Sequence, residues 1–162
     1  KLIITPSKSA VRSVVDRIRR IMKACLGLKT LVMVQRLNSS IRGWTNYHRH
    51  VCSKDTFSHV DNCVYKNLWN WMKRRHSNKG KRWLYDEYFR AVGSRNWVFF
   101  ASEKTGGGES KILDLLVAST TKIVRHIQIK ARANPYDRAW DGYFDARIAR
   151  RLCSPVPVRP SW

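Results

Sequence analysis

The sequence has few acidic residues for its size. Its 162 residues include only 11 Asp and Glu against 32 Lys and Arg, for a formal net charge of +21. A small folded domain with this charge repels itself unless a polyanion neutralises it. Nineteen of the basic residues but only three of the acidic ones precede Asp86, so the excess lies chiefly in the N-terminal half. The shortage of acidic residues therefore predicts a nucleic acid as the partner.

Two other features are scarce. The four cysteines include no CxxC pair, which favours free thiols in a reducing interior over a disulfide scaffold. No apolar run is long enough to span a bilayer, so we expect no membrane association. Aromatic residues, by contrast, are plentiful, with seven Trp, six Tyr and five Phe. This content predicts a folded chain and argues against a disordered basic tail.

Apolar residues at intervals of three and four predict three amphipathic helices in the first half of the chain. The first is expected over about residues 7–26, with Thr5 as its N-cap and Pro6 in its first turn. The second begins at Thr30, and the third follows from Phe57 to Met72. Because the connections are short, these helices favour a small bundle.

The second helix has two informative positions. Its apolar stripe includes Trp44 and Tyr47, which we expect to pack in the core. Gly43 lies inside the same helix at a propensity cost of about 1 kcal/mol relative to alanine. We therefore expect another backbone to approach Gly43 closely.

The second half of the chain has a mixed pattern. We expect a short helix over 83–91, strands over 97–100 and 123–129, a glycine-rich loop over 105–109 and a last helix capped by Asn134. The fold class is therefore mainly α, a three-helix bundle followed by a small α+β basic domain. The predicted domains are residues 1–78 for the bundle, 79–152 for the basic domain and 153–162 for a disordered tail.

Candidate metal and catalytic groups are weak. His59 and Cys63 lie one helical turn apart, but no second pair completes a tetrahedral site. Asp137, Asp141 and Asp145 share a helix face, and such rows usually balance nearby arginines. No nucleophile motif is present. We therefore predict no metal site, no cofactor and no catalytic residue in this chain.

The second helix carries a stronger pattern for nucleic-acid binding. Arg42, Asn46 and Arg49 follow at intervals of four and three, so they share one edge of the helix. Arginine donates two parallel hydrogen bonds to phosphate, and asparagine can read a base edge or a 2′-hydroxyl. The alternative is that Arg42 pairs with a nearby acid and Asn46 bridges helices.

A dense cationic segment follows the third helix and must face water or phosphate, because like charges so close together oppose packing. Its predicted RNA-binding residues are Lys73, Arg74, Arg75, Lys79, Lys81 and Arg82. On the third helix, Tyr65 and Trp69 lie off the apolar stripe. They are placed either to stack on bases or to form a second packing interface.

The same residues resemble the maturase-specific, or thumb, region of group II intron reverse transcriptases. The resemblance rests on five blocks in order, from about Thr5 to Leu152. They are Leu37-Asn38 with Ile41 to Arg49, then Trp71 with Lys73 to His76 and Asn78-Lys79, Arg95 to Phe99, Arg125 to Lys130, and Asn134 to Asp137 before Trp140 and Tyr143-Phe144.

The resemblance implies a module that binds intron RNA, assists its folding and splicing, and supports template-primer binding in reverse transcription and retrohoming. The region after the bundle would contact target DNA or more RNA through Arg95, Arg125 and Lys130. Expected partners are group II intron RNA, target DNA and the fingers-palm region of the reverse transcriptase. The expected location is a ribonucleoprotein in bacterial cytoplasm, or alternatively in an organellar matrix.

Two alternatives remain open at this stage. The family's members are RNA-directed DNA polymerases, so the chain could be the non-catalytic part of an active enzyme whose palm is on missing or separate sequence. Mg²⁺ is then expected only in that polymerase domain and in the RNA. The other alternative is a ribosomal-type structural RNA-binding protein, which fits the charge but not the ordered blocks.

Overall fold

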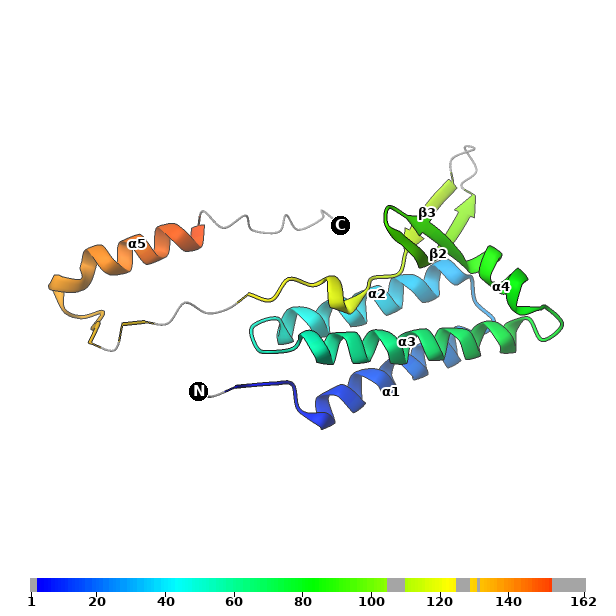
Figure 1. Cartoon of the computed structure of the whole chain (residues 1–162), viewed down its shortest axis with the longest axis horizontal. Helices are drawn as coiled ribbons and strands as arrows, with labels where there is room; N and C mark the ends of the chain where they lie inside the picture. The colour runs from blue at the N-terminus through cyan, green and yellow to red at the C-terminus, as the bar shows by residue number, and fades with distance from the viewer. Residues whose placement is uncertain (1–2, 105–109, 125–128, 131, 153–162) are drawn as a thin grey trace. The chain divides into compact units, whose positions relative to one another are not determined.

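The computed structural model describes residues 3–104, 110–124, 129–130 and 132–152 (Figure 1). The chain divides into two compact units, Lys1–Arg125 and His126–Trp162. The first unit contains α1 (Lys8–Ala24), α2 (Thr30–His48), α3 (Lys54–Arg75), α4 (Lys81–Tyr88), β1 (Phe89–Val92), β2 (Arg95–Lys104), β3 (Ser110–Asp114) and the 3₁₀ turn η1 (Ala118–Thr120). The second contains the 3₁₀ turn η2 (Arg138–Trp140) and α5 (Asp141–Leu152).

The three long helices confirm the predicted helical first half, with corrections at the ends. The prediction that Thr5 caps α1 is wrong, because the cap is Ser7, whose Oγ accepts a hydrogen bond of 3.2 Å from the amide of Ala10. Pro6 therefore precedes the helix. The helix also ends at Ala24, two residues before the predicted end.

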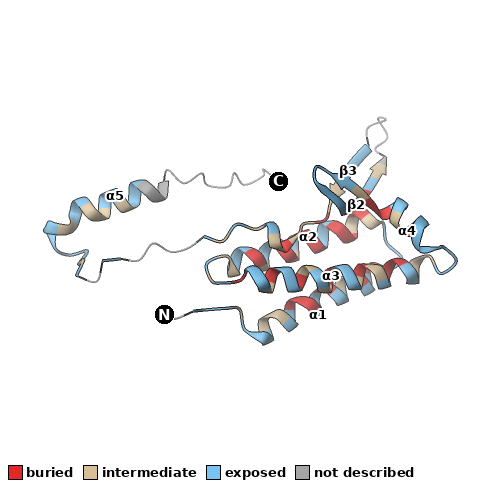
Figure 2. Cartoon of the chain, in the orientation of Figure 1, coloured by how far each residue is buried: buried red, intermediate tan, exposed pale blue. Residues whose placement is uncertain are grey.

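The inner faces of α1, α2 and α3 enclose the main core. Ile18, Met33, Leu37, Phe57 and Leu68 are almost completely buried there, and Figure 2 shows buried residues along the facing sides of the three helices. The short connection between α2 and α3 makes these two helices antiparallel (Figure 1). The mainly α class is therefore confirmed.

A small antiparallel sheet with strand order β1-β2-β3 packs on this helical core. Phe89 of β1 and Phe99 of β2 are paired in register, and both belong to the core cluster of the helices. Gly93 forms the turn between these strands with a φ of 59°, a conformation that favours glycine. The predicted domain boundary after residue 78 consequently falls inside the first unit.

The predicted elements of the second half are partly corrected. The short helix ends at Tyr88, and the residues after it form β1. The strand predicted at 97–100 is confirmed as part of β2, whereas β3 was not predicted. The strand predicted over 123–129 is wrong at Ile123, Val124 and Ile129, none of which lies in a strand, and 125–128 fall outside the described residues.

Residues 115–124 form a segment, here called the strap, which runs from β3 across α2 and α3. Asn38 holds its start, because Nδ2 donates to the carbonyl of Asp114 at 2.8 Å and Oδ1 accepts from the amide of Leu116 at 2.7 Å. Asp61 accepts from the amides of Ala118 and Ser119 at 2.7 and 2.8 Å. Two buried or half-buried polar side chains thus bind the strap to the helices.

The second unit begins its helical part differently from the prediction. The Oδ1 atom of Asp137 accepts from the amide of Ala139 at 3.0 Å and caps η2, which leads into α5. Asn134 instead accepts from the amide of Tyr136 in the preceding turn. The prediction that Asn134 caps the last helix is therefore wrong. The loop predicted over 105–109 and the tail predicted over 153–162 lie outside the described residues.

Candidate nucleic-acid interface

The edge of α2 predicted to bind RNA faces solvent. Arg42 and Asn46 are exposed and Arg49 is half-buried. The side chains of Arg42 and Asn46 have no hydrogen bond or ion pair to any described residue, so the alternative that they serve internal contacts is not what the structure shows. These two side chains are therefore available to a ligand.

The rotation of α2 about its axis explains this exposure. Leu37, Ile41 and Thr45 point into the core, and with 100° per residue the opposite face then contains Gly43 and Tyr47. The prediction that Tyr47 packs in the core is wrong, because its side chain is 79% exposed. Trp44 is half-buried and meets the ring of Phe57 with centroids 5.5 Å apart.

His48 lies among aromatic rings at the end of the same helix. Its ring centroid is 4.7 Å from that of Trp44 and 4.8 Å from that of Tyr47. Burial lowers the pKa of His48 below its ordinary value of 6.5. The imidazole is therefore neutral at physiological pH and adds no positive charge to this edge.

The second predicted group lies around the end of α3. Lys73 and Arg74 are exposed in the last turn, where the helix dipole favours cations. Arg75 makes internal contacts that were not predicted. Its Nη1 donates to the carbonyls of Leu26 and Leu28 at 3.2 and 2.6 Å, and its guanidinium lies 5.1 Å from the ring centroid of Trp71. Arg75 therefore fastens the α1–α2 connection to α3.

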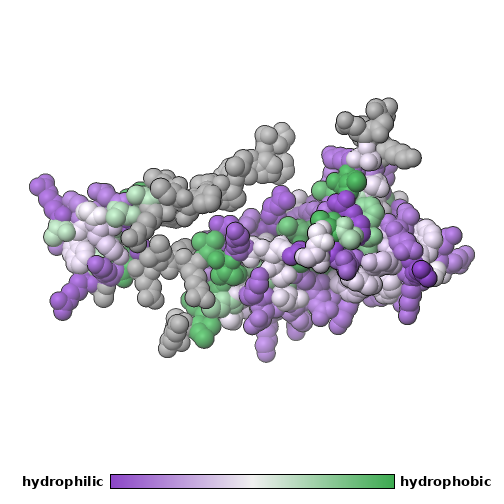
Figure 3. Space-filling model, turned by 45° about the horizontal axis from the view of Figure 1, so that its top comes forward, coloured by the Kyte–Doolittle hydropathy of each residue, from purple (hydrophilic) through white to green (hydrophobic). Residues whose placement is uncertain are grey.

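The cationic segment continues into α4. Lys79 lies over Trp83 with its Nζ 5.2 Å from the ring centroid. Lys81 and Arg82 are exposed in the first turn of α4, which contains no acidic residue. Cations are unfavourable at this positive end of a helix, so an anion bound there would relieve the repulsion. Figure 3 shows mostly hydrophilic residues at this end of the bundle.

The structure does not bring the two groups together. Arg49 follows the end of α2, next to the start of α3, whereas Lys73 lies in the last turn of α3. At 1.5 Å per residue, the helix between them spans about 30 Å. The nine predicted residues therefore form two patches at opposite ends of the bundle (Figure 1).

A third set of cations was not predicted as a site, although these residues fall off the apolar stripe of the first helix. All are exposed on α1. They are Lys8, Arg12, Arg17, Arg19, Arg20 and Lys23. The charge excess of the N-terminal half was the available signal. Because α1 runs along the bundle (Figure 1), its cations occupy the distance between the two patches.

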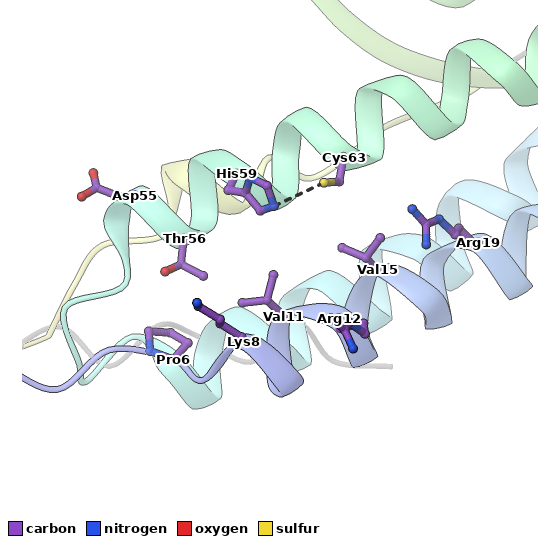
Figure 4. A pocket seen from close by; sticks show the side chains of 10 residues that line it. All are labelled: Pro6, Lys8, Val11, Arg12, Val15, Arg19, Asp55, Thr56, His59 and Cys63. Atoms are coloured by element: carbon purple, nitrogen blue, oxygen red, sulfur yellow. Dashed lines mark hydrogen bonds between the residues drawn. The ribbon is translucent and has the colours of Figure 1, made fainter.

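Two hollows border α1. One, of about 570 Å³, lies between α1 and the first half of α3, with Val11 and Val15 on one wall and Lys8, Arg12 and Arg19 at its edge (Figure 4). On its other wall the Nε2 atom of His59 is 3.7 Å from the Sγ atom of Cys63. The other hollow, of about 320 Å³, lies between α1 and α2.

Internal carboxylates neutralise few cations. The ion pairs in the described part of the chain are Arg19 with Asp16, Lys29 with Glu103 and Arg90 with Asp114. None involves a residue predicted to bind RNA. The predicted cations that the structure describes therefore keep their charge uncompensated by neighbouring acids.

The aromatic residues of α3 form a packing interface. Tyr65 stacks on Trp69 with ring centroids 6.4 Å apart and meets Phe89 at 6.0 Å and Trp97 at 6.3 Å. Of the two roles considered for Tyr65 and Trp69, packing against the sheet is the one observed. Trp97 remains 58% exposed at the edge of this cluster.

The residues predicted to meet DNA or further RNA are separated. Arg95 is exposed at the start of β2, beside the turn at Gly93. Arg125 lies outside the described residues. Lys130 belongs to the second unit, where its Nζ is 5.3 Å from the ring centroid of Tyr143 and 5.9 Å from that of Trp140.

Other kinds of site receive no support from the described ranges. Within them, no three His, Cys, Asp or Glu side chains are grouped so that they could hold a metal ion. None of the helices in those ranges has both the length and the apolar character needed to cross a membrane. Cys25, Cys52 and Cys63 are free thiols.

Residues 11–89 match the family described as group II intron, maturase-specific domain. The matched segment contains almost all of α1, the whole of α2, α3 and α4, and the first residue of β1. It thus includes both cationic patches and the cations of α1 between them, except Lys8. No curated protein matches the chain.

Proposed function

We propose, from the membership of residues 11–89 in the group II intron maturase-specific domain family, that this chain binds group II intron RNA and assists its folding for splicing. The observation that carries the proposal is the exposed, unpaired state of Arg42, Asn46, Lys73 and Arg74 within the matched segment. Uncompensated cations on a rigid helical core attract phosphates at little cost in reorganisation.

The two patches have different roles in this proposal. One patch surrounds the end of α3 and the start of α4. It neutralises phosphates whatever the RNA sequence, through Lys73, Arg74, Lys81 and Arg82. Asn46 is the uncharged polar member of the α2 edge, beside Arg42. Its amide can donate and accept at a base edge or a 2′-hydroxyl, so it supplies discrimination.

The finer roles follow from the same surface. An RNA that contacts both patches must span about 30 Å along α3. Binding at both patches therefore favours an RNA fold that places phosphates this far apart. Stabilising such an RNA fold would assist splicing. The proposed partners also include target DNA, contacted through Arg95 and Lys130, and the fingers-palm region of a reverse transcriptase. The expected setting is a bacterial or organellar ribonucleoprotein.

The roles can be tested with single variants of the whole chain. We expect Arg74→Ala to weaken binding to intron RNA and to an unrelated structured RNA by similar factors, since a phosphate contact carries no sequence information. We expect Asn46→Ala to weaken binding to the intron RNA by about 1–3 kcal/mol and binding to the unrelated RNA much less. Equilibrium filter binding measures both.

Asn70→Ala is the matched control, because Asn70 is an exposed asparagine of α3 outside the predicted patches. It should leave both affinities near those of the unaltered chain. If Asn46→Ala and Arg74→Ala lowered the two affinities in the same ratio, the assignment of discrimination to Asn46 would be wrong. If the unaltered chain showed no preference for intron RNA, the proposed function would be wrong.

A further inference from the structure

Gly43 lies at a position where the structure gives no internal reason for glycine. The sequence predicted that another backbone approaches it, and the structure shows this prediction to be wrong. A Cβ atom built at Gly43 would meet no atom within 4 Å. Gly43 is inside α2 and is exposed, where glycine destabilises a helix relative to alanine. The space over Gly43 is therefore open to a group from outside the described fold.

That space is the hollow of about 320 Å³ between α1 and α2. Its polar lining comes from Ser13 and Arg17 of α1 and from Ser39, Ser40 and Trp44 of α2, with Gly43 between them. No carboxylate lines it. The lining therefore offers hydroxyl groups and one cation, a combination that suits an anion with several acceptor oxygens.

Several of these donors lack partners. Arg17 is exposed and forms no ion pair with a described residue, because the neighbouring Asp16 pairs with Arg19 at 2.9 Å. Ser40 and Trp44 line the hollow, and the Ser40 hydroxyl and the Trp44 indole Nε1 are buried without a hydrogen-bond partner among the described residues. Unpaired buried donors destabilise a fold unless something accepts from them.

We propose that this hollow receives a phosphodiester group of the bound RNA, with Gly43 as the point of closest approach. Arg17 supplies the charge, and Ser13, Ser39 and Ser40 supply hydroxyl donors. Tyr47 lies one turn further along the same face and is 79% exposed, so the base next to that phosphate can stack on it. The inference rests on the proposed function and adds a specific backbone contact to it.

The test fills the hollow without changing charge. Gly43→Leu places a good helix former where the structure has open space, so we expect the melting temperature to stay equal or rise. Affinity for intron RNA should fall by about tenfold, and the slope of log affinity against log salt should decrease by about one unit, as for the loss of one phosphate contact. Arg17→Gln should reproduce both effects, and the double variant should bind no more weakly than either single variant.

Two variants serve as controls. Gln35→Leu adds an exposed leucine to α2 outside the hollow, and Lys23→Gln removes a charge from α1 outside the hollow. Gln35→Leu should bind like the unaltered chain, and Lys23→Gln should lose less affinity than Arg17→Gln. Ethylation of single RNA phosphates should identify a position that weakens binding of the unaltered chain but not of Gly43→Leu.

The outcomes separate this inference from the proposed function. If the unaltered chain prefers intron RNA but Gly43→Leu binds it with unchanged affinity and salt slope, the hollow does not hold a phosphate. Additive losses in the double variant would also overturn the inference, because they would place Arg17 and Gly43 at different contacts. If the unaltered chain has no affinity for intron RNA, the proposed function fails and the hollow loses its ligand.

Discussion

At the scale of single residues, sequence spacing identified Arg42 and Asn46 as outward-facing, but it misplaced Tyr47. The stripe through Trp44 and Tyr47 looked continuous, yet the core is already filled by Leu37, Ile41 and Thr45 on a narrower face. For a related reason, the internal contacts of Arg75 could not be predicted. A charge run predicts exposure, and it does not show that one guanidinium is used to bind the carbonyls of Leu26 and Leu28.

The environment of His48 makes the free energy of unfolding depend on pH. Burial among aromatic rings lowers the pKa of His48 in the folded chain. As the pH falls, the unfolded chain therefore binds a proton at His48 at a higher pH than the folded chain does. The contribution of neutral His48 to the free energy of unfolding is therefore complete above the unfolded pKa of about 6.5 and is lost as the pH falls toward the lower pKa of the folded state.

Denaturant unfolding between about pH 5 and pH 7.5 measures this effect in the unaltered chain and in His48→Gln. We expect the unaltered chain to lose more stability than His48→Gln over the acidic half of that range. His59→Gln, which alters an exposed histidine of α3, should follow the unaltered chain. Identical pH profiles for the unaltered chain and His48→Gln would show that His48 is not perturbed.

At the scale of elements, the three long helices could be predicted because their apolar stripes persist over about four turns or more. Elements held by tertiary contacts could not. The strap carries little periodicity of its own, and its course is set by side chains far away in sequence, Asn38 and Asp61. β3 is different, because it pairs with β2, the strand next to it in the sequence, and it was still not predicted. The alternating pattern at 123–129 led instead to a strand that the structure does not show at Ile123, Val124 and Ile129.

The attachment of the strap to α3 depends on the carboxylate of Asp61. Asp61→Ala removes the acceptor for the amides of Ala118 and Ser119, and we expect it to lower the free energy of unfolding by about 1–3 kcal/mol. Hydrogen exchange at these two amides should become faster. Asp55→Ala is the control, because it removes the same charge from the first turn of α3 without touching the strap. Unchanged exchange in Asp61→Ala would contradict this account of how the strap is held.

At the scale of the whole molecule, composition predicted a nucleic-acid partner, since a net charge of +21 on 162 residues makes a compact domain repel itself. The arrangement of the charge could not be predicted. No distance between the cationic edge of α2 and the cationic segment that begins in the last turn of α3 could be read from the sequence, and the length of α3 places them about 30 Å apart. The cations of α1 lie between them, and their part in the surface emerges only when the helices are packed.

In the proposed function, unpaired cations in several places on the bundle contact RNA phosphates together. The most direct test is the affinity of the whole chain for group II intron RNA between 50 and 200 mM salt. With roughly six to ten phosphate contacts, affinity should fall by about 10³- to 10⁵-fold over this range. A profile that falls tenfold or less would mean that only one or two phosphates are contacted, and it would contradict the claim.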